Sequence, residues 1–169
     1  IPNDFYEKLG PHESIKKSKF DFIDLFAGIG GFRLAMEPLG GQCMFSSEWE
    51  PNAKLTYFRN HGSYPFGDIN KYTGESISDD EVASIIPNHD ILAAGFPCQP
   101  FSLAGVSARN AVGKPHGLEC NTQGTLFWSI ERIAKIKRPK LLLLENVKNI
   151  ISHDGRRTFA VIKKSLEDA

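Results

Sequence analysis

One cysteine lies in a restricted stretch of backbone. Cys98 belongs to GFPCQPFS, where Pro97 and Pro100 flank it directly after the apolar run HDILAA. Proline fixes the φ angle, so the thiol is presented from a rigid segment. A nucleophile gains from this, since good positioning lowers a barrier by ~7 to 11 kcal/mol. We interpret Cys98 as a nucleophile, with a small packing residue as the alternative; no second cysteine or histidine lies at metal-ligand spacing.

A glutamate ends another apolar run. Glu145 follows four leucines in PKLLLLENV, where a buried strand would end. A carboxyl group is costly to bury unless it is paired or protonated. A carboxyl that keeps its proton near neutral pH can act as a general acid, which is the role we predict for Glu145. The alternative is a glutamate that caps the following helix.

Glycines and acids elsewhere indicate a nucleoside ligand. FAGIGG, residues 26–31, follows one apolar run and precedes a helical pattern, so its backbone can turn tightly and approach a ligand. Glu48 ends the next run, where nucleotide-binding folds place an acid for ribose hydroxyls. Trp49 could stack on a base, and Asp68 could accept from an adenine amino group. The plainer alternatives are a ligand-free turn, core packing for Trp49 and an ordinary turn aspartate.

The same segment favours S-adenosylmethionine over a dinucleotide. Its glycines are spaced GxGG and not GxGxxG, and Asp24 lies just before them. An acid close to the ligand attracts a cationic group and repels a phosphate.

Strand and helix patterns alternate along the chain. Apolar runs predict strands that begin near Phe20, Gln42, His89 and Pro139. Helical spacing predicts helices over 32–39, 51–61, 79–86, 125–137 and 157–167, with Glu50 or an adjacent residue as a cap before Pro51. This order predicts an α/β domain with a mainly parallel sheet, and the unbroken apolar runs predict strands buried on both faces. The segment 103–124 has no periodicity and predicts a long loop.

The predicted sheet would gather the unusual residues. Ligands of such sheets bind at the carboxyl ends of the strands. FAGIGG, SSEWE, GFPCQPFS and ENV each follow a predicted strand, so we expect them along one edge.

Composition indicates one soluble domain. The 169 residues are 41% hydrophobic, and 20 basic side chains balance 20 acidic ones, so overall charge does not indicate a polyanion ligand. Three cysteines without a CxxC pair favour a reducing, cytoplasmic setting. No signal peptide or membrane span is predicted. We expect residues 1–19 to form a peripheral arm, and we expect a longer protein because the last helical pattern lacks a cap.

Six segments together resemble one enzyme family. FIDLFAGIGG, SEWE, GDI, GFPCQPFS, GTLFWSIERI and LLLLENVKN match the cytosine-C5 DNA methyltransferases in order and spacing, from Phe20 to His153. The loop GVSARNAVGKPHGLECNTQGTLF resembles the Dcm and EcoRII-like subgroup. The resemblance implies a Rossmann-like methyltransferase fold with helices on both faces of the sheet. Residues 20–169 would form a partial catalytic domain, because no target-recognition region or later motif is present.

The resemblance also implies a mechanism. The Cys98 thiolate would attack carbon 6 of a cytosine flipped out of DNA, and carbon 5 would then accept a methyl group from S-adenosylmethionine. Glu145 would hold or protonate ring nitrogen 3, and Asn146 would position the cysteine loop. Gln99 and Ser102 complete the implied catalytic set. Loss of the carbon-5 proton and elimination of the thiol would end the reaction.

The implied cofactor contacts lie in several segments: Phe26, Gly28, Gly30, Gly31, Glu48, Trp49, Asp68, Ile69, Pro97 and Leu126. Ser102, Arg109 and Lys114 are candidate contacts to DNA phosphates, with a solvated loop surface as the alternative for all three. No metal is implied.

Partners follow from the resemblance too. We expect double-stranded DNA as substrate, a functional link to a restriction endonuclease, and a monomer at full length. We expect the isolated chain to bind cofactor weakly and not to methylate. Two alternatives stay open: a transfer RNA cytosine-C5 methyltransferase with the same chemistry, and a non-catalytic S-adenosylmethionine-binding module on DNA. A nicotinamide-dependent dehydrogenase is disfavoured by the glycine spacing and gives Cys98 no role.

Overall fold

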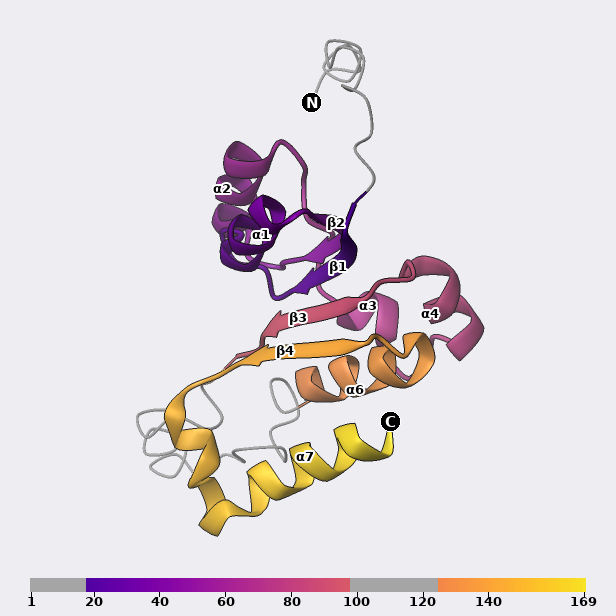
Figure 1. Ribbon diagram of the computed structural model, residues 1–169. Coiled ribbons are helices and arrows are strands. Elements are labelled where there is room, and N and C mark those ends of the chain that lie inside the picture. Colours follow the sequence, from indigo (N-terminus) through magenta and orange to yellow (C-terminus); the bar gives the residue numbers. More distant parts are fainter. Residues whose placement is uncertain (1–17, 98–124) are drawn as a thin grey trace.

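Four parallel strands form the centre of the protein (Figure 1). The computed structural model describes residues 18–97 and 125–169. The sheet has the order β2-β1-β3-β4, from β1 (Phe20–Leu25), β2 (Gly41–Ser47), β3 (Ile91–Gly95) and β4 (Leu141–Glu145). All three pairings are parallel, so the predicted α/β sheet is confirmed. The arm predicted over 1–19 lies almost wholly outside the described residues, and the loop predicted over 103–124 lies entirely outside them.

The strand order creates a crevice at the carboxyl edge. The chain passes from β1 outward to β2, then returns across β1 to β3 and continues outward to β4. Connections therefore leave β1 and β3 in opposite directions, which separates them at this edge. In open α/β sheets, ligands bind at such a reversal point.

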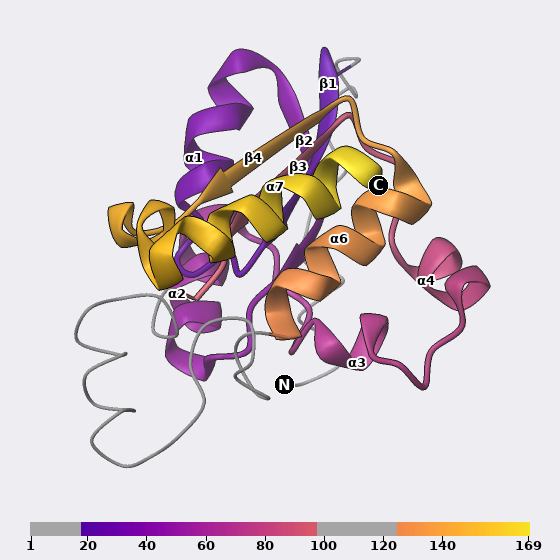
Figure 2. The same ribbon diagram turned by 90° about the horizontal axis from the view of Figure 1, so that it is seen from below.

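Helices cover both faces of the sheet, as predicted (Figure 2). On one side lie α1 (Gly31–Met36), continued by the 3₁₀ helix η2 (Glu37–Leu39), and α2 (Pro51–His61). On the other side lie α3 (Asn70–Thr73), α4 (Asp79–Ile85) and α6 (Thr125–Lys137). The short helices η4 (Lys148–Ile151) and η5 (His153–Arg156) lead into α7 (Arg157–Asp168), which runs beside α6.

Helix boundaries agree with the local signals. Glu50 caps α2, because its carboxylate accepts from the Ala53 backbone N–H at 2.6 Å, and Gly62 ends the helix at φ +70°. The single helix predicted over 32–39 is instead α1 followed by η2. Pro38 has no N–H and cannot continue an α-helical ladder. The short helices α3, η4 and η5 were not predicted, because a single turn shows no period.

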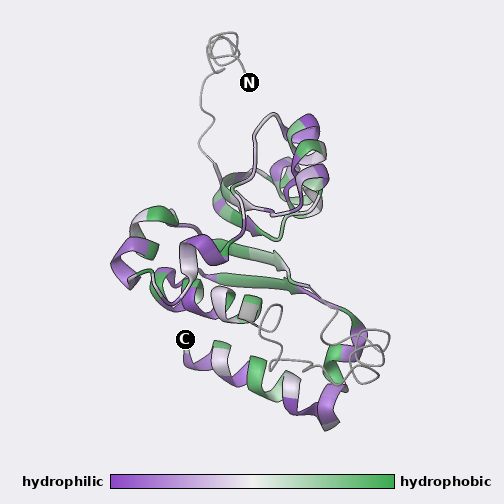
Figure 3. Ribbon diagram, turned by 180° about the vertical axis from the view of Figure 1, so that it is seen from behind, coloured by the Kyte–Doolittle hydropathy of each residue, from purple (hydrophilic) through white to green (hydrophobic). Residues whose placement is uncertain are grey.

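The two faces of the sheet pack differently. Ile23 and Leu92 point into the larger core, which includes Phe127 and Ile130 of α6. Phe22 and Ala93 point to the opposite face, where they meet Met36 of α1. In Figure 3 the strands are mainly hydrophobic, whereas the helices carry both kinds of residue.

Burial of β4 on both faces was predicted, and this was wrong. Leu142 and Leu144 pack on the larger core, but Leu141 and Leu143 are 51% and 42% exposed. In the part of the chain that the structure describes, the hydrophobic cluster on that face contains residues of α1, β1, β2 and β3 and none of β4. No helix among the described residues is long and apolar enough to cross a membrane.

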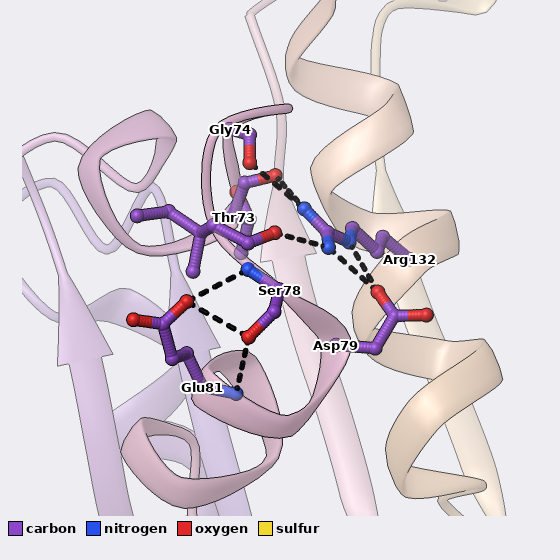
Figure 4. Close-up of polar contacts among 7 residues, drawn as sticks. Thr73, Gly74, Ser78, Asp79, Glu81 and Arg132 are labelled. Atoms are coloured by element: carbon purple, nitrogen blue, oxygen red, sulfur yellow. Dashed lines mark hydrogen bonds and ion pairs between the residues drawn. The ribbon is translucent and has the colours of Figure 1, made fainter.

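Arg132 joins α6 to the segment that connects α3 and α4 (Figure 4). Its guanidinium donates to the carbonyl oxygens of Thr73 at 2.9 Å, Gly74 at 2.8 Å and Ile77 at 2.6 Å. It also pairs with Asp79 at 2.6 Å, in the first turn of α4. A capping box between Ser78 and Glu81 starts this helix. One planar side chain thus holds a loop that has no strand to pair with.

Asp24 is the fully buried charged residue of β1. Neither of its carboxyl oxygens has a hydrogen-bond partner in the described part of the chain. Burial raises the pKa of Asp24 to about 7; the nearby Arg33 offsets this only in part, and Glu48 adds to it. The folded protein therefore holds a proton on Asp24 at pH values where the unfolded chain has released it.

Replacing Arg132 tests the tie between α6 and the α3–α4 connection. Arg132→Met should lower the free energy of unfolding by about 1–3 kcal/mol, because several charge-assisted hydrogen bonds are lost. Lys135→Met on the same helix removes only an exposed pair with Glu131 and should cost about 0.5 kcal/mol or less. Urea unfolding measures both variants, and equal losses would contradict the role given to Arg132.

Asp24 predicts a pH dependence of stability. Because its pKa is raised from 3.8 to about 7 on folding, its contribution is fully present below pH 3.8 and is lost as pH rises toward 7. At about 1.4 kcal/mol per pKa unit, the loss is at most about 4 kcal/mol. Asp24→Asn removes the titration, so the variant should gain stability relative to the unmodified chain as pH rises. Urea unfolding between pH 4 and 8 checks this, and a difference that stays constant with pH would refute it.

Candidate active site

A pocket of about 250 Å³ opens at the carboxyl edge of the sheet. Most predicted cofactor residues line it: Phe26, Glu48, Trp49, Asp68, Ile69, Pro97 and Leu126. Segments from after β1, β2 and β3 and the start of α6 contribute to its walls. Residues that are far apart in sequence therefore meet at one site.

Glu48 is the most firmly held acid of the pocket. The residue is only 8% exposed. Its Oε2 accepts from the Gly28 N–H, and its Oε1 accepts from the Glu50 N–H, both at 2.8 Å. Each carboxylate oxygen keeps further lone-pair capacity, so Glu48 can accept from two more donors, such as vicinal hydroxyls.

The glycine turn after β1 adopts left-handed backbone angles. Phe26, Gly28 and Gly30 have φ of +56°, +55° and +94°. A positive φ is unfavourable for phenylalanine, and such residues cluster at functional sites. Cβ atoms added to Gly28 and Gly31 would meet nothing within 4 Å, which leaves open space above this backbone. None of the three predicted glycines lines the pocket itself, but Gly28 is bonded to Glu48, which does.

Asp68 reaches the pocket because its segment runs alongside the end of β2. The Phe66 N–H donates to the Ser46 carbonyl at 2.8 Å, and the Glu48 N–H donates to the Phe66 carbonyl at 3.0 Å. The Phe66 ring also stacks on Phe45 at 4.7 Å between centroids. The Oδ1 atom of Asp68 accepts from the Asn70 N–H at 3.0 Å, which leaves Oδ2 for a ligand.

Trp49 and Asp24 differ in their relation to the pocket. The Trp49 side chain lines it and is 71% exposed, so core packing does not explain this tryptophan. Asp24 is buried and does not line it, although it is close enough to Glu48 for their charges to interact. We predicted that Asp24 attracts a cationic group of the ligand directly, but Asp24 makes no contact with the pocket.

Three pocket residues were missed in the sequence: Ser47, Gly67 and Asn70. The first two are chain neighbours of Glu48 and Asp68, so proximity to a predicted contact was the available signal. Asn70 follows Ile69 in α3, and its side chain accepts from Ser129 of α6 at 3.4 Å. Because the two residues are 59 positions apart, no local sequence pattern indicates this contact.

The second half of the site lies where β3 and β4 end. Glu145 is the register partner of Gly95, and a Cβ added to Gly95 would lie 3.5 Å from its Oε2. Burial of the Glu145 carboxyl group was predicted, and this was wrong: Glu145 is exposed, because it ends the exposed edge strand β4. The Asn146 side chain donates to the Phe96 carbonyl at 3.0 Å, and its Oδ1 accepts from the Val147 N–H at 2.9 Å. Asn146 therefore joins the segment that follows β4 to the segment that follows β3. The residue it bonds there, Phe96, lies two positions before Cys98 in the sequence.

The other predicted catalytic and phosphate-contacting residues lie outside the described residues: Cys98, Gln99, Ser102, Arg109 and Lys114. Among the described residues, no group of three or more histidine, cysteine or acidic side chains could hold a metal ion.

Comparison with known proteins agrees with this geometry. The sequence model of the C-5 cytosine-specific DNA methylase family matches residues 20–169. The DNA-cytosine methyltransferase of Escherichia coli K12 is 50% identical over 161 residues, which is 88% of this chain and 34% of that protein. The type II methyltransferase M.HhaI of Haemophilus parahaemolyticus is 45% identical over 147 residues, with 87% of this chain and 39% of the relative covered. The chain thus spans between a third and two fifths of the length of these relatives.

Solved structures share the fold. The Dnmt2 methyltransferase of S. pombe superposes with a TM-score of 0.59 at 15% identity, over 86% of this chain and 40% of that one. The Entamoeba histolytica methyltransferase EhMeth gives 0.58 at 20% identity, over 90% and 44%. At these identities the likeness shows the Rossmann-like α/β methyltransferase fold alone. The family match covers the pocket, Asn146 and Glu145 together, and the chain belongs to the C-5 cytosine-specific DNA methylase family.

Proposed function

We propose that this chain supplies the cofactor pocket and catalytic edge of a DNA cytosine-C5 methyltransferase. The observation that carries the proposal is the Asn146 side chain, which bonds the Phe96 carbonyl at 3.0 Å. This bond ties the segment that carries Glu145 to the segment that leads into Cys98. Attack on a cytosine ring requires a thiol and a carboxyl group close together, and the bond between Asn146 and Phe96 supports the proposal that Cys98 and Glu145 are this pair.

S-adenosylmethionine fits the donors and acceptors of the pocket. The Glu48 oxygens would accept from the ribose hydroxyls, Trp49 would stack on the adenine, and Asp68 Oδ2 would accept from the adenine amino group. Open space above Gly28 and Gly31 lets a ligand approach the backbone there. When bound, the cofactor supplies an electrophilic methyl group.

The protein's own residues would activate the base. The Cys98 thiolate would bond to carbon 6 of cytosine, and the electrons of the carbon 5–carbon 6 double bond would shift toward carbon 4 and nitrogen 3, where Glu145 would hold a proton. Carbon 5 would then be nucleophilic and would take the methyl group, with S-adenosylhomocysteine as the leaving product. Loss of the carbon-5 proton and departure of the thiolate then restore the aromatic ring. Asn146 keeps the cysteine segment in place through Phe96.

DNA is the substrate that the relatives favour. The E. coli relative is a DNA-cytosine methyltransferase, and the Haemophilus parahaemolyticus relative is a type II methyltransferase. RNA cytosine methylation would use the same chemistry, so the substrate is decided by experiment. We further propose that the full-length protein is a monomer that acts on double-stranded DNA. A restriction endonuclease would be its functional partner.

Glu48→Gln tests the cofactor site. Both Glu48 oxygens accept from backbone N–H groups, so an amide nitrogen in place of one oxygen would face a donor. The displaced side chain would also lose a carboxylate acceptor for the ribose hydroxyls. A hydrogen bond to a charged group is worth about 1.5–3 kcal/mol, so the Kd for S-adenosylmethionine should rise at least tenfold. Isothermal titration calorimetry on the full-length gene product measures this.

Glu50→Gln is the matched control. Glu50 caps α2 two residues away and does not line the pocket. Its variant should bind within about twofold of the unmodified protein. The amide oxygen of glutamine can still accept from the Ala53 N–H, and the bond that is lost joins Glu50 to the exposed side chain of Asn52, away from the pocket. A Glu48→Gln variant that binds as well as Glu50→Gln would remove Glu48 from the site.

Covalent trapping tests the reaction itself. Fluorine at carbon 5 cannot leave as a proton does, so a true nucleophile stays bonded to 5-fluorocytosine after methyl transfer. With labelled S-adenosylmethionine, the full-length gene product should form a labelled adduct on duplex DNA, and Cys98→Ser should form none. An adduct on transfer RNA alone would make the substrate RNA. No adduct on either would reduce Cys98 to a packing residue.

A further inference from the structure

The last turn of α2 packs directly on the glycine turn. The Asn60 side chain donates from Nδ2 to the Ile29 carbonyl oxygen at 3.1 Å, across 31 residues of sequence. Ile29 lies between Gly28 and Gly30, in the middle of FAGIGG, and its own side chain is 58% exposed. The Ile29 side chain therefore does not anchor this part of the turn, whereas the bond from Asn60 holds its main chain.

Neighbouring residues on α2 make the contact tight. A Cβ added to Gly30 would lie 2.1 Å from Nε2 of His61 and 3.1 Å from the Tyr57 ring. Tyr57 is fully buried, and its ring lies 4.7 Å from the His61 imidazole between centroids. Any side chain at Gly30 would push α2 away, and would also be unfavourable at φ +94°.

Two side chains thus hold consecutive residues of the turn. Glu48, just before α2, accepts from the Gly28 N–H at 2.8 Å, and Asn60, near the end of α2, donates to the Ile29 carbonyl. The turn begins with Phe26, whose φ of +56° is rare for a residue other than glycine. Such a backbone conformation persists only where several surrounding contacts hold it in place. Glu48 lines the pocket, whereas Asn60 lies outside it.

We propose that Asn60 is a positioning residue for the cofactor, acting through the main chain of Ile29. This rests on the proposed function, because the turn matters only if S-adenosylmethionine binds beside it. Asn60 is exposed, so its bond adds little to folding. Its effect is on the conformation of the turn. The peptide between Ile29 and Gly30 is held by two hydrogen bonds, from Asn60 to the Ile29 carbonyl at 3.1 Å and from the Gly30 N–H to the Ala27 carbonyl at 2.8 Å. Without the Asn60 bond only the bond within the turn remains, so the peptide is held less firmly in the conformation that the cofactor requires.

Asn60→Ala in the full-length gene product tests the proposal. The Kd for S-adenosylmethionine, measured by titration calorimetry, should rise about three- to tenfold. The KM for S-adenosylmethionine should rise in parallel, while kcat at saturating cofactor and the cofactor-free Tm stay near those of the unmodified protein. Asn60→Asp, nearly the same shape, should bind more weakly still, because a carboxylate faces the Ile29 carbonyl.

Thr56→Ala is the matched control. Thr56 lies one turn earlier on α2, and its hydroxyl donates to the Asn52 carbonyl at 3.0 Å, within the helix. This variant also loses one side-chain hydrogen bond but no contact to the turn, so its Kd should be unchanged.

The outcomes separate this proposal from the proposed function. If the unmodified protein binds no S-adenosylmethionine, the proposed function fails first. If it binds, and Asn60→Ala binds equally well, the role of Asn60 is refuted. An Asn60→Ala variant that loses Tm and kcat at unchanged Kd, or a Thr56→Ala variant that weakens binding as much, would show a general effect on α2 and would also refute it.

Discussion

The parallel register of the sheet is the constraint on which the site depends. Because all four strands run in the same direction, the segments after them leave from one edge. Pairing of Leu25 with Ser47 brings the glycine turn beside Glu48, and pairing of Gly95 with Glu145 brings the end of β3, three residues before Cys98 in the sequence, beside a carboxyl group. A shift of one residue in either pair would turn alternate side chains to the opposite face and separate these groups.

Polar groups of the site are held mainly by the backbone. Glu48 accepts from two N–H groups, Asp68 from one, and Asn146 bridges a carbonyl and an N–H. A side chain held this way loses its conformational freedom on folding and not on ligand binding. Carboxylate oxygens can still accept further hydrogen bonds, so the same groups are fixed and available to a ligand. Asn60 extends this arrangement from the pocket to the turn beside it.

Strand β1 and the residue after it carry two features that lower the stability of the fold and lie next to the site. Asp24 is buried without a hydrogen-bond partner in the described residues, and two residues later Phe26 has a positive φ. Both features are unfavourable for folding alone. The apolar residues on either side, Ile23 and Leu25, are fully buried and offset this cost. A strand with three fully buried apolar residues, Phe22, Ile23 and Leu25, therefore also carries an unpaired carboxyl group directly before the strained glycine turn.

Local patterns in the sequence determined the elements and most of the candidate site. Pro51 and Glu50 start α2 and Gly62 ends it, so its predicted and observed bounds agree, and motifs after each strand identified most of the pocket lining. Tertiary structure alone decided which face of β4 is covered, that Gly30 packs on α2 while Gly28 faces open space, and that Asn70, Arg132 and Asn60 reach across the fold. The physical reason is range: caps and periodicity act over a few residues, whereas these contacts join segments 31 to 59 residues apart and exist only once the sheet has formed.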